Sequence, residues 1–223
     1  MDLKVEPQLS SKDLFLLYKH LYDYLGPQYW WPGETKEEIS IGAILTQNTT
    51  WKNVEKAIEN LKREGLLDFK KILELDKDYL AQLIKPSGYY NQKAQKLKNF
   101  AEFMLKEFGG KFDVSIDKWS LREKLLSVKG VGKETADSII LYAFEKPIFV
   151  VDAYTKRILL RHGVIESDKI EYDEIAKLFY LSIPEDVKIY NEYHALFVNI
   201  GKNYCSKRTP KCNECPIKKL IKD

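Results

Sequence analysis

Residues 125–136 read LLSVKGVGKETA, and this stretch decides the fold. An apolar helical pattern runs into Gly130 and Gly132, and a second helical pattern starts directly after them. Glycines permit a tight turn, and they let a ligand approach the backbone because no Cβ stands in the way. An ordinary helix–helix turn usually needs only one glycine, so the Gly-Val-Gly spacing favours a hairpin that binds a ligand through its backbone.

Positive charge gathers at the start of the second helix. Lys129 and Lys133 flank the glycines, and Thr135 follows within the first helical turn. Amide groups at a helix N-terminus point outwards beside the positive end of the helix dipole, where they bind phosphate groups. We therefore predict a helix-hairpin-helix over about residues 121–143 that grips a phosphate.

Helical periodicity also dominates on both sides of this hairpin, and it predicts an all-α fold. Further helices are expected over residues 14–25, 37–64 with an interruption near 46–50, 68–83, 91–108, 117–128, 134–144, 155–162, 172–181 and 186–200. The β-branched run at residues 148–151 has the propensity of a strand, but a lone strand has no pairing partner. We therefore predict an extended, buried connection there, which delivers Asp152 to a fixed place.

The composition is that of a packed protein with a charged surface. Hydrophobic residues make up 44% of the 223 residues and charged residues 31%, and the net charge is +3. This charge permits nucleic-acid binding without demanding it. No apolar run approaches the roughly 20 residues that cross a bilayer, and the N-terminus lacks the pattern of a secretion signal. We expect no membrane partner and a cytoplasmic, nucleoid-associated protein.

Asp152 lies shortly after the hairpin and directly before a predicted helix. An Asp in such a place is most often the N-cap of the helix, because its carboxylate accepts a hydrogen bond from the first turn. Taken alone, it gives weak support for catalysis. A glycine hairpin followed by an Asp on VVDAYTKR, residues 150–157, gives the catalytic interpretation more weight.

This pairing resembles the helix-hairpin-helix/Gly-Pro/Asp superfamily of DNA glycosylases, and more narrowly its endonuclease III branch. The resemblance runs from about Trp30 to Cys215. It includes GAILTQNT at residues 42–49, where the family has a DNA-contacting Gln, and SGYYNQKA at residues 87–94, where the family's loop wedges the duplex. It implies base-excision repair by a monomer that binds double-stranded DNA containing a damaged base.

The resemblance also implies the domain organisation. Two helical lobes enclose a DNA-binding cleft. The first lobe, residues 28–145, contains six helices and ends with the hairpin. Residues 1–27 and 146–223 form the second lobe, which carries a C-terminal cysteine loop.

Roles for single residues follow from the same resemblance. Asp152 is the catalytic carboxylate, which stabilises positive charge on the deoxyribose as the N-glycosidic bond breaks and guides a water. Gln47 and Tyr89 are candidates to fill the gap left by the flipped base, with Tyr90 as the alternative to Tyr89. The other candidate DNA-binding residues belong to the hairpin: Lys129, Gly130, Gly132, Lys133 and Thr135.

Glu134 is the informative departure from the family, and we count it with Asp152 among the candidate catalytic positions. Bifunctional members carry a Lys here, which attacks the sugar and cuts the strand through a Schiff base. A carboxylate cannot form an imine, so we predict a monofunctional glycosylase. The alternatives are that Lys133 substitutes as nucleophile in a glycosylase/AP lyase on oxidised pyrimidines, that the enzyme is a mismatch glycosylase, or that the chain is a non-catalytic DNA-structure binder.

Two adjacent tryptophans are candidates for the base pocket. Trp30 and Trp31 precede Pro-Gly and cannot both lie on one buried helical stripe. A flipped base is held by stacking on an aromatic face, and cationic alkylated purines suit an electron-rich indole. With residues 45–49 and 132–137, the pair resembles the 3-methyladenine-removing members of the branch, and a pyrimidine or mismatch substrate is the alternative.

Three cysteines end the chain with metal-ligand spacing. Cys205, Cys212 and Cys215 follow C-x6-C-x2-C, which resembles the first three ligands of the endonuclease III [4Fe–4S] cluster. The fourth ligand falls at Ile221, which cannot bind iron. We favour a cluster with a non-cysteine fourth ligand.

The alternatives to such a cluster are zinc or no metal. The nearest oxygen ligand is Asp223, while His162 and His194 are the histidines that could complete a zinc site.

Overall fold

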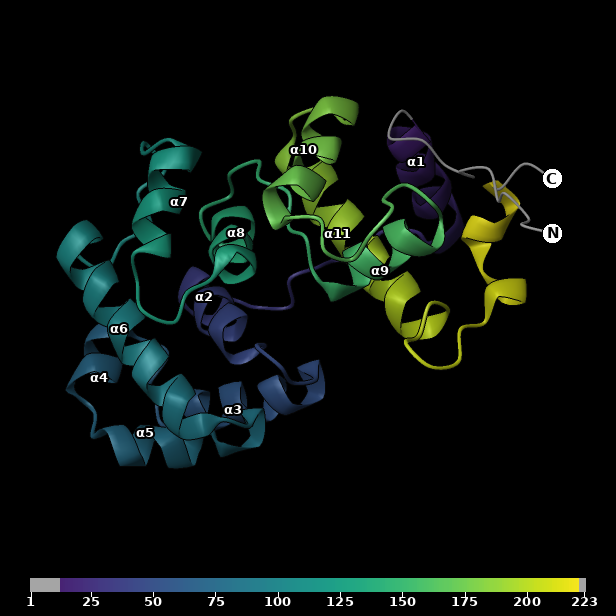
Figure 1. The fold of residues 1–223 in the computed structure, drawn as a ribbon. Coiled ribbons are helices and arrows are strands. Elements are labelled where there is room, and N and C mark those ends of the chain that lie inside the picture. The colour runs from purple at the N-terminus through teal and green to yellow at the C-terminus, as the bar shows by residue number, and fades with distance from the viewer. Residues whose placement is uncertain (1–12, 221–223) are drawn as a thin grey trace. The chain divides into compact units, whose positions relative to one another are not determined.

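The computed structural model describes residues 13–220, in which every regular element is a helix and none is a strand (Figure 1). The predicted all-α fold is confirmed. The chain divides into two compact units, one of Trp31–Ile148 and one of Met1–Trp30 with Phe149–Asp223. Within the described range, no helix is long and apolar enough to cross a membrane.

The described part of the Trp31–Ile148 unit contains seven α-helices and one short 3-10 helix. They are α2 (Lys36–Leu45), α3 (Trp51–Arg63), α4 (Phe69–Glu74), α5 (Lys77–Leu83), η2 (Lys85–Ser87), α6 (Tyr90–Phe108), α7 (Lys118–Leu126) and α8 (Lys133–Tyr142). The sequence predicts one helix over residues 68–83, and this is wrong, because α4 and α5 are separate helices. Leu75 has an extended backbone, and the Asp76 carboxylate then accepts hydrogen bonds from two amides to start a new helix.

Helix α6 organises the packing of this unit. It contacts α2, α4, α5 and η2, while α8 packs on both α2 and α7. The two hairpin helices are joined by an ion pair in which Arg122 of α7 donates to Asp137 of α8, with Nε 2.6 Å from Oδ1 and Nη2 3.1 Å from Oδ2. The side chain of Asp137 is only 1% exposed. The hairpin is therefore fixed from inside the core.

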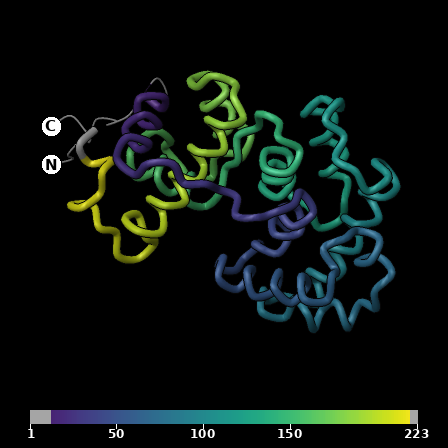
Figure 2. The backbone as a smooth tube through the Cα atoms, turned by 180° about the vertical axis from the view of Figure 1, so that it is seen from behind, coloured from purple at the N-terminus to yellow at the C-terminus, as the bar shows by residue number. Residues whose placement is uncertain are grey.

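The second unit is also helical. Its elements are α1 (Leu14–Leu25), α9 (Ala153–Arg161), α10 (Tyr172–Ser182), α11 (Val187–Asn203), η3 (Cys212–Glu214) and η4 (Pro216–Leu220). Helix α1 contacts α11 and also η4, so segments from opposite ends of the chain pack together, as the purple and yellow parts of the trace show (Figure 2). Buried aromatic rings fill its core, and Phe149 stacks on Phe179 with the ring centroids 3.6 Å apart.

The segment that precedes Asp152 is buried and forms neither helix nor strand, in agreement with the buried connection predicted for this run. Its backbone amides do not need a neighbouring strand because tyrosine hydroxyls accept their hydrogen bonds. The Phe149 amide donates to the Tyr180 hydroxyl at 3.3 Å, and the Val151 amide donates to the Tyr172 hydroxyl at 3.2 Å. Both tyrosines belong to α10, which thereby fixes the approach to Asp152.

Candidate active site

The two hairpin glycines differ in why the fold needs them. Gly130 has φ +101°, and a Cβ there would collide with the stem of Lys96 from α6. Gly132 has φ −96° as the N-cap of α8, and no atom of the described residues lies within 4 Å of a Cβ built on it. Packing therefore explains the first glycine. The second leaves open space in front of a helix N-terminus, which suits a phosphate approaching the backbone.

The start of α8 carries charges of both signs. Lys129 and Glu134 are exposed, Lys133 is half-buried and Thr135 is buried. Glu134 lies in the first turn of α8. Its carboxylate suits the helix dipole. The peptide carbonyl of Lys129 accepts a hydrogen bond from Asn99 Nδ2 at 2.9 Å, which ties the turn to α6.

Gln47 lies against the hairpin, although the two are distant in sequence. Its amide Nε2 donates to the Thr135 hydroxyl at 2.9 Å and to the Gly130 carbonyl at 3.2 Å, while its carbonyl accepts from Lys96 Nζ. The structure therefore brings together three predicted DNA-binding residues. Lys96 completes the group, and the sequence analysis does not identify it.

A buried lysine joins the two loops that carry the candidate gap-filling residues. Lys93 Nζ donates to the Leu45 carbonyl at 2.8 Å and to the Ser87 carbonyl at 2.7 Å, and its side chain is only 1% exposed. Burial, and secondarily the charge of Lys96, lowers the pKa of Lys93 to about 8. These bonds hold together the segments that lead to Gln47 and Tyr89.

Tyr89 is held away from the core. Its side chain is 64% exposed, and its backbone adopts a left-handed φ of +46°. Residues other than glycine rarely adopt this conformation, and it is often found at functional sites. Tyr90 begins α6 and is half-buried, so Tyr89 is the better placed of the two to enter a duplex.

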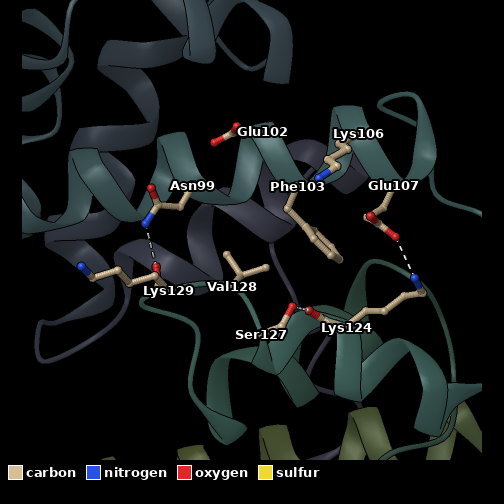
Figure 3. Close-up of a pocket in the computed structure, with 9 residues that line it drawn as sticks. All are labelled: Asn99, Glu102, Phe103, Lys106, Glu107, Lys124, Ser127, Val128 and Lys129. Carbon is tan, nitrogen blue, oxygen red and sulfur yellow. Dashed lines mark hydrogen bonds and ion pairs between the residues drawn. The ribbon is translucent and has the colours of Figure 1, made fainter.

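A pocket of about 360 Å³ opens beside the hairpin (Figure 3). It is lined by Phe103 and other α6 residues, and by Val128 and Lys129 from the turn after α7. Lys124 and Glu107 form an ion pair at its rim, 2.7 Å apart. Neither predicted base-pocket tryptophan lines this pocket. Its lining residues come from α6, from α7 and from the hairpin turn.

The adjacent tryptophans belong to different units. Trp31 lies against Gly42 of α2, and its ring centroid is 5.3 Å from those of Trp51 and Tyr142. Trp30 has the Lys202 ammonium 5.5 Å from its ring centroid. Both indoles are half-buried, so neither is purely a core residue.

Asp152 has two differently occupied carboxylate oxygens. Oδ1 accepts from the Thr155 amide at 2.7 Å and from the Thr155 hydroxyl at 2.9 Å, so Asp152 is the N-cap of α9. Oδ2 lies 3.6 Å from His194 Nε2, slightly beyond hydrogen-bond length. The side chain is 12% exposed. Capping and catalysis are therefore compatible, because capping occupies only one oxygen.

The surroundings keep this carboxylate ionised. Burial raises the pKa of Asp152, but the proximity and charge of His194 and the hydrogen bonds from Thr155 outweigh it, so the pKa lies below its ordinary value. From the sequence, His194 is predicted only as an alternative zinc ligand. The sequence feature that points to a buried role for His194 is that it directly precedes an apolar helical stretch, residues 195–198.

The cysteine loop does not present a metal-binding group in the described residues. Cys205 and Cys215 are buried, Cys212 is exposed, and Arg161 Nη1 lies 3.2 Å from Cys205 Sγ. The pKa of the Cys215 thiol is raised, chiefly through burial. Within residues 13–220, no three His, Cys, Asp or Glu side chains are arranged to hold a metal ion.

The predicted completions of that site do not supply the missing ligand either. Ile221 and Asp223 lie outside the described residues. His194 lies beside Asp152, and His162 belongs to no metal-binding group in the described part of the chain. Within residues 13–220, these side chains therefore do not supply a complete ligand set for a cluster or a zinc ion.

Comparison with known proteins gives consistent matches. A model of HhH-GPD superfamily base excision DNA repair proteins matches residues 41–185. A putative DNA repair glycosylase of Methanocaldococcus jannaschii is 52% identical over 210 residues, which cover 93% of this chain and 94% of that protein. An endonuclease III of Thermotoga maritima is 31% identical over 182 residues, covering 81% of this chain and 79% of that protein.

A solved structure is similar as well. It is the crystal structure of the H. pylori 3-methyladenine DNA glycosylase bound to 1,N6-ethenoadenine, which has a TM-score of 0.73 and 32% sequence identity. The alignment covers 86% of this chain and 97% of the other.

Proposed function

Because the chain belongs to the HhH-GPD superfamily of base excision DNA repair proteins and is a DNA glycosylase, we propose that it removes alkylated purines by hydrolysis alone. The membership confirms the superfamily that the hairpin and Asp152 predict. One observation carries the proposed chemistry. The Asp152 carboxylate is shielded from solvent, yet its neighbours keep it ionised.

In the proposed reaction, the bond between C1′ and the base nitrogen breaks, and the base leaves with the bonding electrons. Positive charge then builds on the sugar, and a shielded, ionised Asp152 stabilises this charge more strongly than a carboxylate in water. The carboxylate also orients a water for attack on C1′ and accepts its proton, which then passes to the departing base or, where that base leaves as a neutral molecule, to solvent. The products are the free base and an uncut strand with an abasic site.

The monofunctional assignment is supported by Glu134. Strand cutting through a Schiff base requires an amine at the sugar, and the residue in that position carries a carboxylate. Lys133 precedes it by one residue, and one residue turns a side chain by about 100° around a helix. Lys133 therefore faces a different direction from the missing lysine.

The proposed substrate class is supported by the tryptophans and by one relative. Alkylated purines that are cationic leave easily and are attracted to an indole face. Trp30 already faces a cation, the Lys202 ammonium. The H. pylori enzyme, 32% identical, is named for 3-methyladenine and holds ethenoadenine.

Gln47 and Tyr89 are proposed to occupy the duplex once the base has left it. Insertion of side chains between base steps costs a few kcal/mol of stacking, which contacts to the bent duplex offset. The exposure and left-handed backbone of Tyr89 support this role. Gln47 is supported by its bonds to the hairpin, which place it beside the proposed phosphate grip.

A panel of lesion-bearing duplexes tests the proposed reaction. We expect base release from duplexes with 3-methyladenine or ethenoadenine, and strand breaks that appear only after alkali. With borohydride and abasic DNA, we expect no covalent protein–DNA adduct, because no amine replaces the missing lysine. Gel analysis with and without alkali measures both outcomes.

Matched variants separate the alternatives in this experiment. A borohydride adduct that disappears in Lys133→Met would show that Lys133 is the nucleophile and would refute the monofunctional assignment. Release of oxidised pyrimidines or mismatched bases in preference to alkylated purines would refute the substrate class.

The two hairpin glycines offer a second test, of the phosphate grip. Gly132→Ala is expected to leave the melting temperature unchanged, because its backbone conformation and surroundings accept a Cβ. Its affinity for undamaged duplex DNA should fall about tenfold, the equivalent of one hydrogen bond to a charged group. Fluorescence anisotropy measures the affinity.

Gly130→Ala is the matched control. Its positive φ and contact with Lys96 predict a loss of about 1–3 kcal/mol in the free energy of unfolding. Unchanged DNA affinity in the Gly132 variant would contradict a phosphate bound at this helix end.

The [4Fe–4S] cluster suggested by Cys205, Cys212 and Cys215 stays a prediction. Visible absorbance and iron analysis of the purified protein test it without reference to activity.

A further inference from the structure

His194 is a buried polar side chain that the proposed reaction does not use. It lies on α11, its side chain is 6% exposed, and its Nε2 is 3.6 Å from Oδ2 of Asp152. The other carboxylate oxygen is held by the amide and hydroxyl of Thr155. The two carboxylate oxygens therefore have different neighbours. Oδ1 accepts hydrogen bonds at the start of α9, and Oδ2 faces the His194 imidazole.

Other titratable groups around the pair come from the helices that pack on α11. From α9, the Tyr154 phenol has its pKa raised by burial and then by the nearby carboxylate, and Arg157 lies 5.0 Å from the Tyr154 ring centroid. Helix α1 also packs on α11, but the pKa of its Tyr18 is raised by burial and then by Glu192, not by Asp152 or His194. His194 is the one group among these that favours the ionised carboxylate.

We propose, on the premise of the proposed function, that His194 is a positioning residue which holds Oδ2 of Asp152 in place and keeps the carboxylate ionised for reaction. A carboxylate withdrawn from water tends to take up a proton, and a protonated Asp152 can neither stabilise a cationic sugar nor accept a proton from water. The Thr155 donors reach only Oδ1, so they leave Oδ2 to be held by another group. His194 acts on the remaining oxygen.

The experiment compares single-turnover base release by His194→Gln, His194→Leu and the unaltered enzyme between about pH 5 and pH 8. The probe is a duplex carrying ethenoadenine, or the lesion of the panel that is released fastest. Gln keeps a donor but cannot acquire charge, and Leu removes both. His162→Gln is the matched control, because it alters another histidine of the same unit, one that is half-buried.

We expect the acid limb of the rate profile to move to higher pH in both His194 variants. Without the histidine, burial acts on Asp152 with only the Thr155 bonds opposing it, so its pKa rises. Relative to the unaltered enzyme, each variant should lose on the order of tenfold more of its base-release rate at the acid end of the pH range than at the alkaline end. DNA affinity should not change, and His162→Gln should follow the unaltered enzyme.

Two outcomes overturn this inference. One is an unchanged acid limb in a folded His194→Gln. The other is an equal loss at every pH with a lowered melting temperature, which indicates a merely structural role. Asp152→Asn distinguishes failure of the inference from failure of the proposed function. If that variant is active, the proposed function fails; if it is inactive while the His194 profiles are unchanged, only the role of His194 fails.

Discussion

Replacement of Asp152 by Asn is expected to abolish base release while leaving the fold and DNA binding in place. Asn caps helices about as well as Asp, and its carbonyl oxygen can accept the same bond from the Thr155 amide. What disappears is the negative charge that stabilises the cationic sugar. We expect the single-turnover rate of base release to fall about 10³-fold or more.

Asp186→Asn is the matched control for this substitution. Asp186 caps α11 of the same unit by accepting from the Ile189 amide, and it is exposed. It should lose neither base release nor DNA affinity. Persistence of base release in Asp152→Asn would refute the catalytic role, while simultaneous loss of melting temperature and DNA binding would reduce Asp152 to a cap.

The wild-type pH dependence follows from the same carboxylate. Its pKa is lowered in the folded protein, so the ionised form persists as the pH falls until that lowered pKa is reached. Base release is therefore expected to be retained through mildly acidic pH and to be lost only below it. His194 shapes this acid limb, which makes the pH profile the readout that connects the two residues.

Local patterns in the sequence were enough to predict the helical fold, the hairpin and the buried run before Asp152. Each depends on neighbours in the chain: periodicity, two glycines, or a β-branched segment without a partner. The break within residues 68–83 is also local, because Asp76 is a helix cap. The apolar periodicity across it outweighed that signal.

Contacts between distant segments could not be predicted in the same way. Gly130 and Gly132 look alike in sequence, and only the approach of Lys96 shows that one is needed for packing. Lys93 is a charged residue that a pattern assigns to the surface, yet its ammonium donates to the distant Leu45 carbonyl and to the nearby Ser87 carbonyl in the core. His194 meets Asp152 through the packing of α11 on α9.

The ion pair inside the hairpin, between Arg122 and Asp137, is expected to contribute more to the stability of its unit than the Lys124–Glu107 pair. Arg122→Met leaves Asp137, 1% exposed, as a buried carboxylate without its guanidinium. Breaking a buried pair in this way typically costs about 3–5 kcal/mol. We expect a loss of that size in the free energy of unfolding, measured by urea denaturation, and weaker DNA binding because α7 no longer fixes α8.

Two further variants show whether the loss arises from the buried charge. Lys124→Met removes a lysine from the same helix, but its pair with Glu107 is partly exposed, so a cost of at most about 1 kcal/mol is expected. Adding Asp137→Asn to Arg122→Met removes the stranded charge and should recover much of the stability. If Arg122→Met costs no more than Lys124→Met, the pair does not hold the hairpin. Then the apolar contacts between α7 and α8 must set the geometry that presents Gly132 to a phosphate.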